Sequence, residues 1–278
     1  MNEQMTIFDF LDNSAIDDKF FKIDKPVRLI ELFAGVGTQA MALERLGVDF
    51  SHYKMVEFDK YAVTSYNAIH GTSFSTTNVK NIKAEDLRIV DTDKYSYIMT
   101  YSYPCTDLSV AGYGLGYAEG SGTRSALLWE VKRILAECKA LENNMNSECE
   151  IYGMPQVLLM ENVIQVHTKS NGNIEHFNKW LNFLESLGYK NFWQDINAKD
   201  MGVPQNRNRC FVVSILGNYE YKFPEPIPLE SCIEDFLESE ENIAPKFRVS
   251  EEKQKIFLSN LIKEEQKTLE QITNEKNS

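Results

Sequence analysis

The chain alternates between short apolar segments and segments in which apolar residues recur every three or four positions. The apolar segments have the length and composition of strands, at residues 27–33, 53–59, 78–82, 95–100, 157–160, 191–196 and 210–215. The periodic segments have the spacing of amphipathic helices, at residues 41–46, 60–69, 126–135 and 174–187. Such alternation predicts an α/β fold with a mostly parallel sheet and helices on both of its faces.

Composition divides the chain into three regions. Residues 1–26 are a leader, residues 27–229 hold the alternating pattern, and residues 230–278 are an extension with 12 acidic and 7 basic residues. The extension carries two short helical patterns. The second has an apolar stripe, interrupted by Glu265, at Leu258, Leu261, Ile262, Leu269 and Ile272. This stripe is able to pack on the main domain or on a partner.

Bulk properties limit the class of protein. The chain has 278 residues, of which 43% are hydrophobic, enough for one large domain or two modest ones. It has neither a signal peptide nor an apolar run of the ~20 residues that a membrane span needs. Its five cysteines form no CxxC pair, so we expect a cytoplasmic protein with reduced thiols and no metal site. The net charge of −12 disfavours nucleic-acid binding unless a local basic face or a partner supplies the contacts.

A glycine turn follows the first strand. Gly35 and Gly37 lie between the strand at 27–33 and the helix at 41–46, and Glu57 follows at the end of the second strand. Glycines let the backbone approach a ligand, the helix N-terminus binds a negative group, and the acid accepts hydrogen bonds from ribose hydroxyls. The pattern predicts a nucleotide-binding unit, with a tight turn that binds no ligand as the alternative.

The pair Pro104-Cys105 places a candidate nucleophile between the strand at 95–100 and a glycine-rich run at 111–116. A cysteine at the mouth of a strand, fixed from behind by proline and facing a mobile loop, is placed to attack a substrate. Most free cysteines are instead small buried hydrophobes, which is the alternative for Cys105.

Two further polar pairs lie at strand ends. Glu161 and Asn162 close a buried strand, where open α/β sheets place their active sites; the alternative is a pair that caps the next helix. Arg207 and Arg209 lead into the last strand and, being two residues apart, point to the same face. Such a pair suits phosphate oxygens or a base carbonyl, and the alternative is a solvated pair.

Four motifs therefore occur in order along residues 27–250. They are Phe33-Ala-Gly-Val-Gly37, Pro104-Cys105, Glu161-Asn162-Val163 and Gln205-x-Arg207-x-Arg209. In kind and in order they resemble the motifs of the C5-cytosine DNA methyltransferases, and four ordered matches are hard to obtain by chance. The chain departs from the family pattern at Thr38, Thr106 and Tyr101-Ser102, where Gly, Gln and two glycines are commoner. None of these changes removes a reacting group.

The resemblance implies a Rossmann-like fold that binds S-adenosyl-L-methionine at the carboxyl ends of the first strands. The implied cofactor-binding residues are Phe33, Gly35, Gly37, Glu57, Asn78, Pro104 and Leu127. Phe33 and the glycines would line the methionine and ribose part of the cofactor. Glu57 would bind the ribose hydroxyls, Asn78 would face the adenine amino edge, and Leu127 would contact the cofactor from the far side.

The resemblance also implies a DNA (cytosine-5-)-methyltransferase that acts on double-stranded DNA, alone or in a restriction-modification system. Addition of the Cys105 thiolate to carbon 6 of cytosine would push electron density to carbon 5, which then takes the methyl group. Glu161, oriented by Asn162, would stabilise the developing charge at ring N3. Arg209, with Arg207 behind it, would hold the base carbonyl. The target base has to flip out of the duplex to reach the thiolate.

Other interpretations stay open. The glycine fingerprint also fits an NAD-dependent enzyme, although only fold-level analogy supports that. An RNA cytosine-5 methyltransferase of the same family would share the motifs. A non-catalytic subunit that binds DNA or a partner is a further alternative, and the intact Cys105 and Glu161 argue against it.

Two hypotheses concern the regions outside the main domain. Gln4-x-x-Ile7-Phe8 resembles the short peptide with which replication proteins dock on the bacterial sliding clamp; the alternative is that these residues pack on the main domain. The 63 residues after Ile215 contain no basic, aromatic-rich region able to read a major groove. We therefore expect a second polypeptide to supply target recognition, as in a split enzyme, with an inactive truncated product as the alternative.

Overall fold

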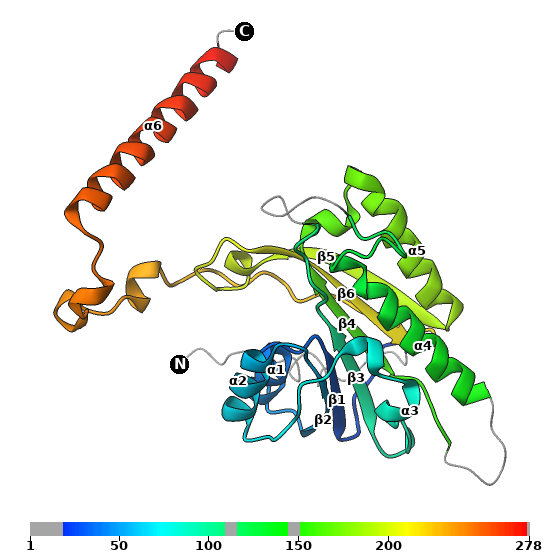
Figure 1. Ribbon diagram of the computed structural model, residues 1–278. Helices are drawn as coiled ribbons and strands as arrows, with labels where there is room; N and C mark the ends of the chain where they lie inside the picture. The colour runs from blue at the N-terminus through cyan, green and yellow to red at the C-terminus, as the bar shows by residue number, and fades with distance from the viewer. Residues whose placement is uncertain (1–18, 109–115, 144–150, 277–278) are drawn as a thin grey trace. The chain divides into compact units, whose positions relative to one another are not determined.

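The computed structural model describes residues 19–108, 116–143 and 151–276, and for residues 240 and 264–276 it describes the backbone alone. The chain divides into two compact units, Met1–Leu229 and Glu230–Ser278. The first unit contains a sheet with helices around it (Figure 1).

The sheet of the first unit has six strands in the order β2-β1-β3-β4-β6-β5. In chain order the strands are β1 Val27–Leu32, β2 Phe50–Val56, β3 Ser96–Tyr101, β4 Val157–Asn162, β5 Tyr189–Asn197 and β6 Asn208–Leu216. Strands β2, β1, β3 and β4 are parallel, and β6 runs antiparallel to both of its neighbours. This confirms the predicted α/β fold with a mostly parallel sheet.

Helices cover both faces of the sheet because strand residues alternate between them. On one face, Leu29 packs with Ala40 of α1 (Thr38–Arg45), and Met55 packs with Tyr66 of α2 (Lys60–His70). On the other face, Ile30 belongs to the large core that contains residues of the remaining helices of this unit. These are α3 Ala84–Leu87, α4 Leu128–Asn143 and α5 Asn173–Ser186. Figure 1 shows α1 and α2 on one side of the sheet and α4 and α5 on the other.

The second unit holds three short 3-10 segments, Ile233–Phe236, Glu240–Asn242 and Pro245–Phe247, and one long helix, α6 Glu251–Lys276. One continuous helix therefore replaces the second of the two short helical patterns. In the described part of the chain, no helix has both the length and the apolar character needed to cross a membrane.

The strand predicted at residues 78–82 is wrong. Residues Val79–Asn81 form a 3-10 turn, and the Asn78 side chain accepts a hydrogen bond from the Lys80 N–H at 3.0 Å. An asparagine side chain can hydrogen-bond to nearby backbone groups and so competes with strand pairing. Here Asn78 caps the start of the 3-10 turn. The second strand also differs, since it spans Phe50–Val56 and leaves Glu57 just beyond its end.

Candidate active site

The loop between β1 and α1 has the backbone of a close-approach turn. Phe33, Gly35 and Gly37 have φ of 58°, 55° and 82°. A Cβ on Gly37 would lie 2.3 Å from His70 Nε2, so only glycine fits there. A Cβ on Gly35 would meet no described atom within 4 Å, so this side of the loop is open to a ligand.

The Glu57 carboxylate holds this loop against the end of β2. Oε2 accepts a hydrogen bond from the Gly35 N–H at 2.9 Å, and Oε1 accepts from the N–H groups of Phe58 and Asp59 at 2.7 and 2.8 Å. A carboxylate has about four lone-pair sites, so three backbone bonds leave room for a ligand hydroxyl. The side chain of Phe58, which sequence reasoning did not single out, is 71% exposed beside it.

Asn78 lies close to Glu57. The residue before it, Thr77, donates its backbone N–H to the Glu57 carbonyl at 2.7 Å. The structure thus brings together the glycine loop, Glu57 and Asn78. Leu127 lies apart from these contacts in the 3-10 turn Ser125–Leu127, half-buried against the main core.

The loop that carries Cys105 is anchored to the segment that contains Arg124 and Ser125. Ser125 Oγ donates to the Pro104 carbonyl at 2.7 Å, and the Asp107 carboxylate, which is 4% exposed, accepts from the N–H groups of Arg124 and Ser125. Cys105 itself is half-buried. Sequence reasoning missed Asp107 and Ser125, because their bonds join segments 17 or more residues apart.

Asn162 connects the end of β4 to the same loop. Its Nδ2 donates to the Tyr103 carbonyl at 3.0 Å, and its Oδ1 accepts from the Val163 N–H at 2.9 Å. The side chain is 2% exposed. Asn162 therefore fixes the backbone two residues before Cys105 relative to Glu161, its own neighbour.

Glu161 faces Arg207 and Arg209, the two arginines predicted from the sequence to share one face. Arg209 Nε lies 3.1 Å from Glu161 Oε1, and Arg207 Nη2 lies 3.6 Å from the same oxygen. The antiparallel register causes this, since Glu161 pairs with Phe211 and Asn162 with Cys210. Their side chains keep partial exposure, 24% for Glu161, 22% for Arg209 and 49% for Arg207.

The glycine loop and the Cys105 segment are also linked, because Gln39 Nε2 of α1 donates to Ser102 Oγ at 3.3 Å. A ligand-accessible loop, an anchored thiol and a carboxyl group with two guanidinium groups thus lie at the carboxyl ends of neighbouring strands. The glycine-rich run at 111–116 falls outside the described residues except for Gly116, and Gln4–Phe8 falls outside them entirely.

Solved structures show which fold this is. The Dnmt2 methyltransferase of S. pombe has a TM-score of 0.51 and 18% identity over 72% of this chain and 52% of that one. The methyltransferase EhMeth of Entamoeba histolytica has a TM-score of 0.56 and 16% identity over 82% of this chain and 64% of that one. The first unit therefore has the Rossmann-like fold of methyltransferases. The family model for C-5 cytosine-specific DNA methylase matches residues 27–278, and the chain belongs to that family.

The chain is also similar in sequence to methyltransferases from several organisms. The type II methyltransferase M2.ScrFI of Lactococcus lactis subsp. cremoris is 34% identical over 80% of this chain. The orphan methyltransferase M.SssI of Spiroplasma monobiae is 31% identical over 70%, and the type II methyltransferase M.NlaX of Neisseria lactamica is 32% identical over 76%. The chain spans 69%, 61% and 60% of the lengths of these three relatives.

Proposed function

We propose that the chain is the catalytic part of a DNA (cytosine-5-)-methyltransferase that acts through a covalent Cys105 adduct. The observation that carries the proposal is the bond from Asn162 to the Tyr103 carbonyl, which fixes the Cys105 loop beside Glu161 and its two arginines. Membership in the C-5 cytosine-specific DNA methylase family supports DNA as the substrate. The relatives include type II methyltransferases, which agrees with it.

The residues at the carboxyl ends of β1 and β2 fit S-adenosylmethionine, which would supply the methyl group. Gly35 leaves open space, the Glu57 carboxylate retains acceptor capacity for ribose hydroxyls, and Asn78 lies next to it. The exposed Phe58 ring offers a stacking surface for an adenine base. Phe33, Gly37 and Pro104 complete the proposed binding set, and Leu127 is proposed to contact the cofactor from the far side.

The proposed reaction gives a role to Cys105, to Glu161 and to the two arginines. The thiolate forms a bond to carbon 6 of the flipped cytosine, and the electron pair of the 5,6 double bond moves to carbon 5 and into the ring. Glu161 stabilises the charge at ring N3, and Arg209 holds the base carbonyl, with Arg207 behind it. After methyl transfer, loss of the carbon 5 proton restores the double bond as the Cys105 sulfur leaves.

A methyl-transfer assay tests this proposal. DNA and total RNA are incubated with the protein and isotope-labelled S-adenosylmethionine, and the modified base is identified by mass spectrometry. Label in 5-methylcytosine of DNA supports the proposal, and label confined to RNA favours the RNA methyltransferase. Glu161→Ala is expected to slow transfer by about 10²–10⁴ with cofactor affinity retained. Loss of cofactor affinity instead would make Glu161 a structural residue.

The split-enzyme and sliding-clamp hypotheses stay predictions. The exposed Leu258, Leu261 and Ile262 share one face of α6 and form a candidate docking element for a recognition polypeptide. A recognition polypeptide with a basic surface, added to the chain, should restore or raise DNA methylation. Robust methylation by the chain alone would end the split-enzyme hypothesis.

The sliding-clamp hypothesis has its own test. A leader peptide that shows no binding to the clamp at ~100 μM would end it. We also propose a cytoplasmic location, where DNA is accessible.

A further inference from the structure

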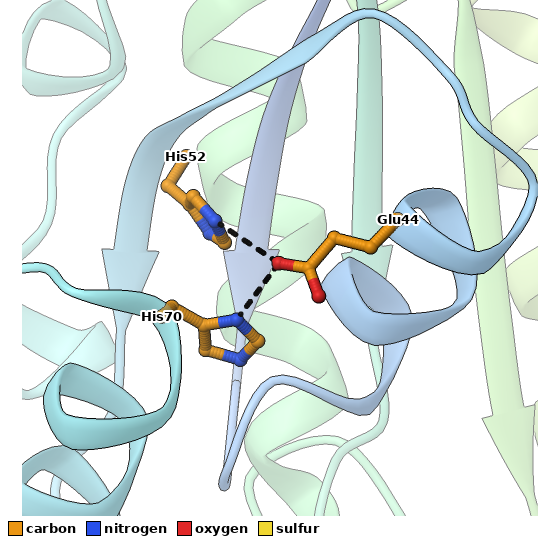
Figure 2. Close-up of side chains that lie close together, drawn as sticks. All are labelled: Glu44, His52 and His70. Carbon is orange, nitrogen blue, oxygen red and sulfur yellow. Dashed lines mark hydrogen bonds and ion pairs between the residues drawn. The ribbon is translucent and has the colours of Figure 1, made fainter.

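Two histidines and a glutamate from three different elements point toward one another (Figure 2). Glu44 lies in the last turn of α1, His52 in β2, and His70 at the end of α2. Glu44 Oε1 is 3.3 Å from His70 Nδ1 and 3.8 Å from His52 Nε2. One ligand atom from each residue lies within 4.8 Å of the others. The three residues are 8 and 18 positions apart, which is no compact ligand motif. The prediction of no metal site was based on the cysteines and did not consider these three residues.

The hydrogen bonds of His70 decide which of its nitrogens carries a proton. Nε2 lies 3.1 Å from the Val36 carbonyl, which only accepts, so Nε2 must carry hydrogen. In neutral His70 the lone pair is then on Nδ1, and Nδ1 faces the Glu44 carboxylate. Two electron-pair donors at this distance require a cation between them, either a proton or a metal ion.

The hydrogen bonds of His52 likewise decide which of its nitrogens carries a proton. The Tyr66 hydroxyl donates its one proton to buried Glu31 at 2.5 Å, so its oxygen accepts from His52 Nδ1 at 2.8 Å. The lone pair of neutral His52 is then on Nε2, which faces the same Glu44 oxygen.

The surroundings have the arrangement of a metal site with its outer hydrogen bonds in place. Histidine ligands of metals usually donate their second N–H to a carbonyl, a carboxylate or a similar acceptor, which fixes the ring. Here the Val36 carbonyl and the Tyr66–Glu31 pair serve that purpose. The His70 side chain is fully buried and that of His52 is 18% exposed, whereas Glu44 is 49% exposed, which leaves an entry path and room for water.

A second cluster with metal-ligating residue types consists of His167, Asp195 and Cys210. Its side chains already form hydrogen bonds with one another. His167 Nε2 lies 2.9 and 3.1 Å from the two Asp195 oxygens, so it donates to that carboxylate. Burial raises the pKa of the Cys210 thiol to about 12, so the thiol keeps its proton beside Asp195. This cluster already holds protons where a metal would have to bind.

We propose that Glu44, His52 and His70 bind a divalent transition-metal ion of the Zn²⁺ type, with water as the fourth ligand. Zinc–ligand bonds of about 2.0–2.1 Å make tetrahedron edges of about 3.3 Å. The His70–Glu44 distance matches such an edge, and the His52–Glu44 distance needs a shift of about half an ångström. The ion would tie α1, β2 and α2 together, and through His70 and the Val36 carbonyl it would stabilise the glycine loop.

Metal titration of the full chain, after chelator treatment, tests the site. We expect one equivalent of Zn²⁺ to bind, and Co²⁺ to give visible ligand-field bands without a sulfur-to-cobalt charge-transfer band. Glu44→Gln and His52→Gln should each weaken binding at least about tenfold. Zn²⁺ should raise the Tm of the unchanged chain and leave the Tm of Glu44→Gln unmoved. The matched controls Glu85→Gln and His176→Gln, outside the cluster, should bind as the unchanged chain does.

Three results would overturn the proposal. They are no Zn²⁺ or Co²⁺ binding at ~1 mM, equal affinity in Glu44→Gln and the unchanged chain, and a sulfur-to-cobalt band that persists in both. Because Glu44 is exposed, its substitution should leave the fold intact, which circular dichroism of the variant checks.

Discussion

Arg209 Nε lies 3.1 Å from Glu161 Oε1, across the antiparallel pair of β4 and β6. Arg207 reaches the same oxygen only to 3.6 Å, and its side chain is more than twice as exposed. A charged contact loses strength with distance and with solvent access. The two arginines therefore should not contribute equally.

We predict that Arg209→Ala lowers kcat for methyl transfer by about 10²-fold, the scale for loss of one preorganised donor. Arg207→Ala should lower it by about tenfold or less, because water reaches that guanidinium. Single-turnover transfer with labelled cofactor measures both rates, and the affinity for the cofactor should not change. Equal losses in the two variants would contradict this assignment.

Asn162 is expected to act as a positioning residue. Asn162→Ala leaves the Tyr103 carbonyl and the Val163 N–H without their partner, which should lower the free energy of unfolding by about 1–3 kcal/mol. The transfer rate should fall as well, because the Cys105 loop loses its tie to β4. Urea unfolding and transfer kinetics measure the two effects. The exposed Asn178→Ala in α5 is the control, and a variant at 162 that behaves like it would refute the role.

Alanine substitutions at the two loop glycines should have different effects, one mainly on stability and the other mainly on cofactor binding. Gly37→Ala puts a Cβ against His70 Nε2 in a left-handed backbone, so stability should fall by more than the roughly 1–2 kcal/mol of the backbone strain alone. Gly35→Ala carries strain without a clash, but its methyl group enters the open side of the loop. We expect it to weaken S-adenosylmethionine binding more than it weakens the fold. Calorimetry of cofactor binding and urea unfolding of both variants provide the comparison.

The thiols should differ sharply in reactivity. Burial raises the pKa of Cys138 and of Cys210 to about 12 each, so at pH 8 these thiols stay protonated and enclosed. Cys232 is exposed and Cys105 half-buried. Iodoacetamide on the folded chain should label Cys232 and Cys105 and spare the other two, and denaturant should remove the difference. Labelling of Cys210 as fast as Cys232, measured by peptide mapping, would contradict the structure. Cys149 lies outside the described residues.

The sequence predicted the α/β alternation and the shared face of Arg207 and Arg209 because both depend on local periodicity. It failed at residues 78–82, where Asn78 bonds to its own turn and outweighs the strand propensity of the following residues. It also missed the Asp107–Ser125 anchor and the cluster of Glu44, His52 and His70. Those groups meet only through the packing of distant segments, which no spacing rule in a single sequence encodes.

The central claim is that Cys105 attacks cytosine, and trapping with 5-fluorocytosine DNA tests it most directly. The fluorine at carbon 5 prevents the last elimination, so the protein with its cofactor, and with any recognition partner it needs, should form a denaturant-resistant DNA adduct. Peptide mapping should place the DNA on Cys105. Cys105→Ser should form no adduct, and Cys232→Ser, the exposed-thiol control, should form it in full. An equally strong adduct with Cys105→Ser, or DNA attached to another cysteine, would contradict the account.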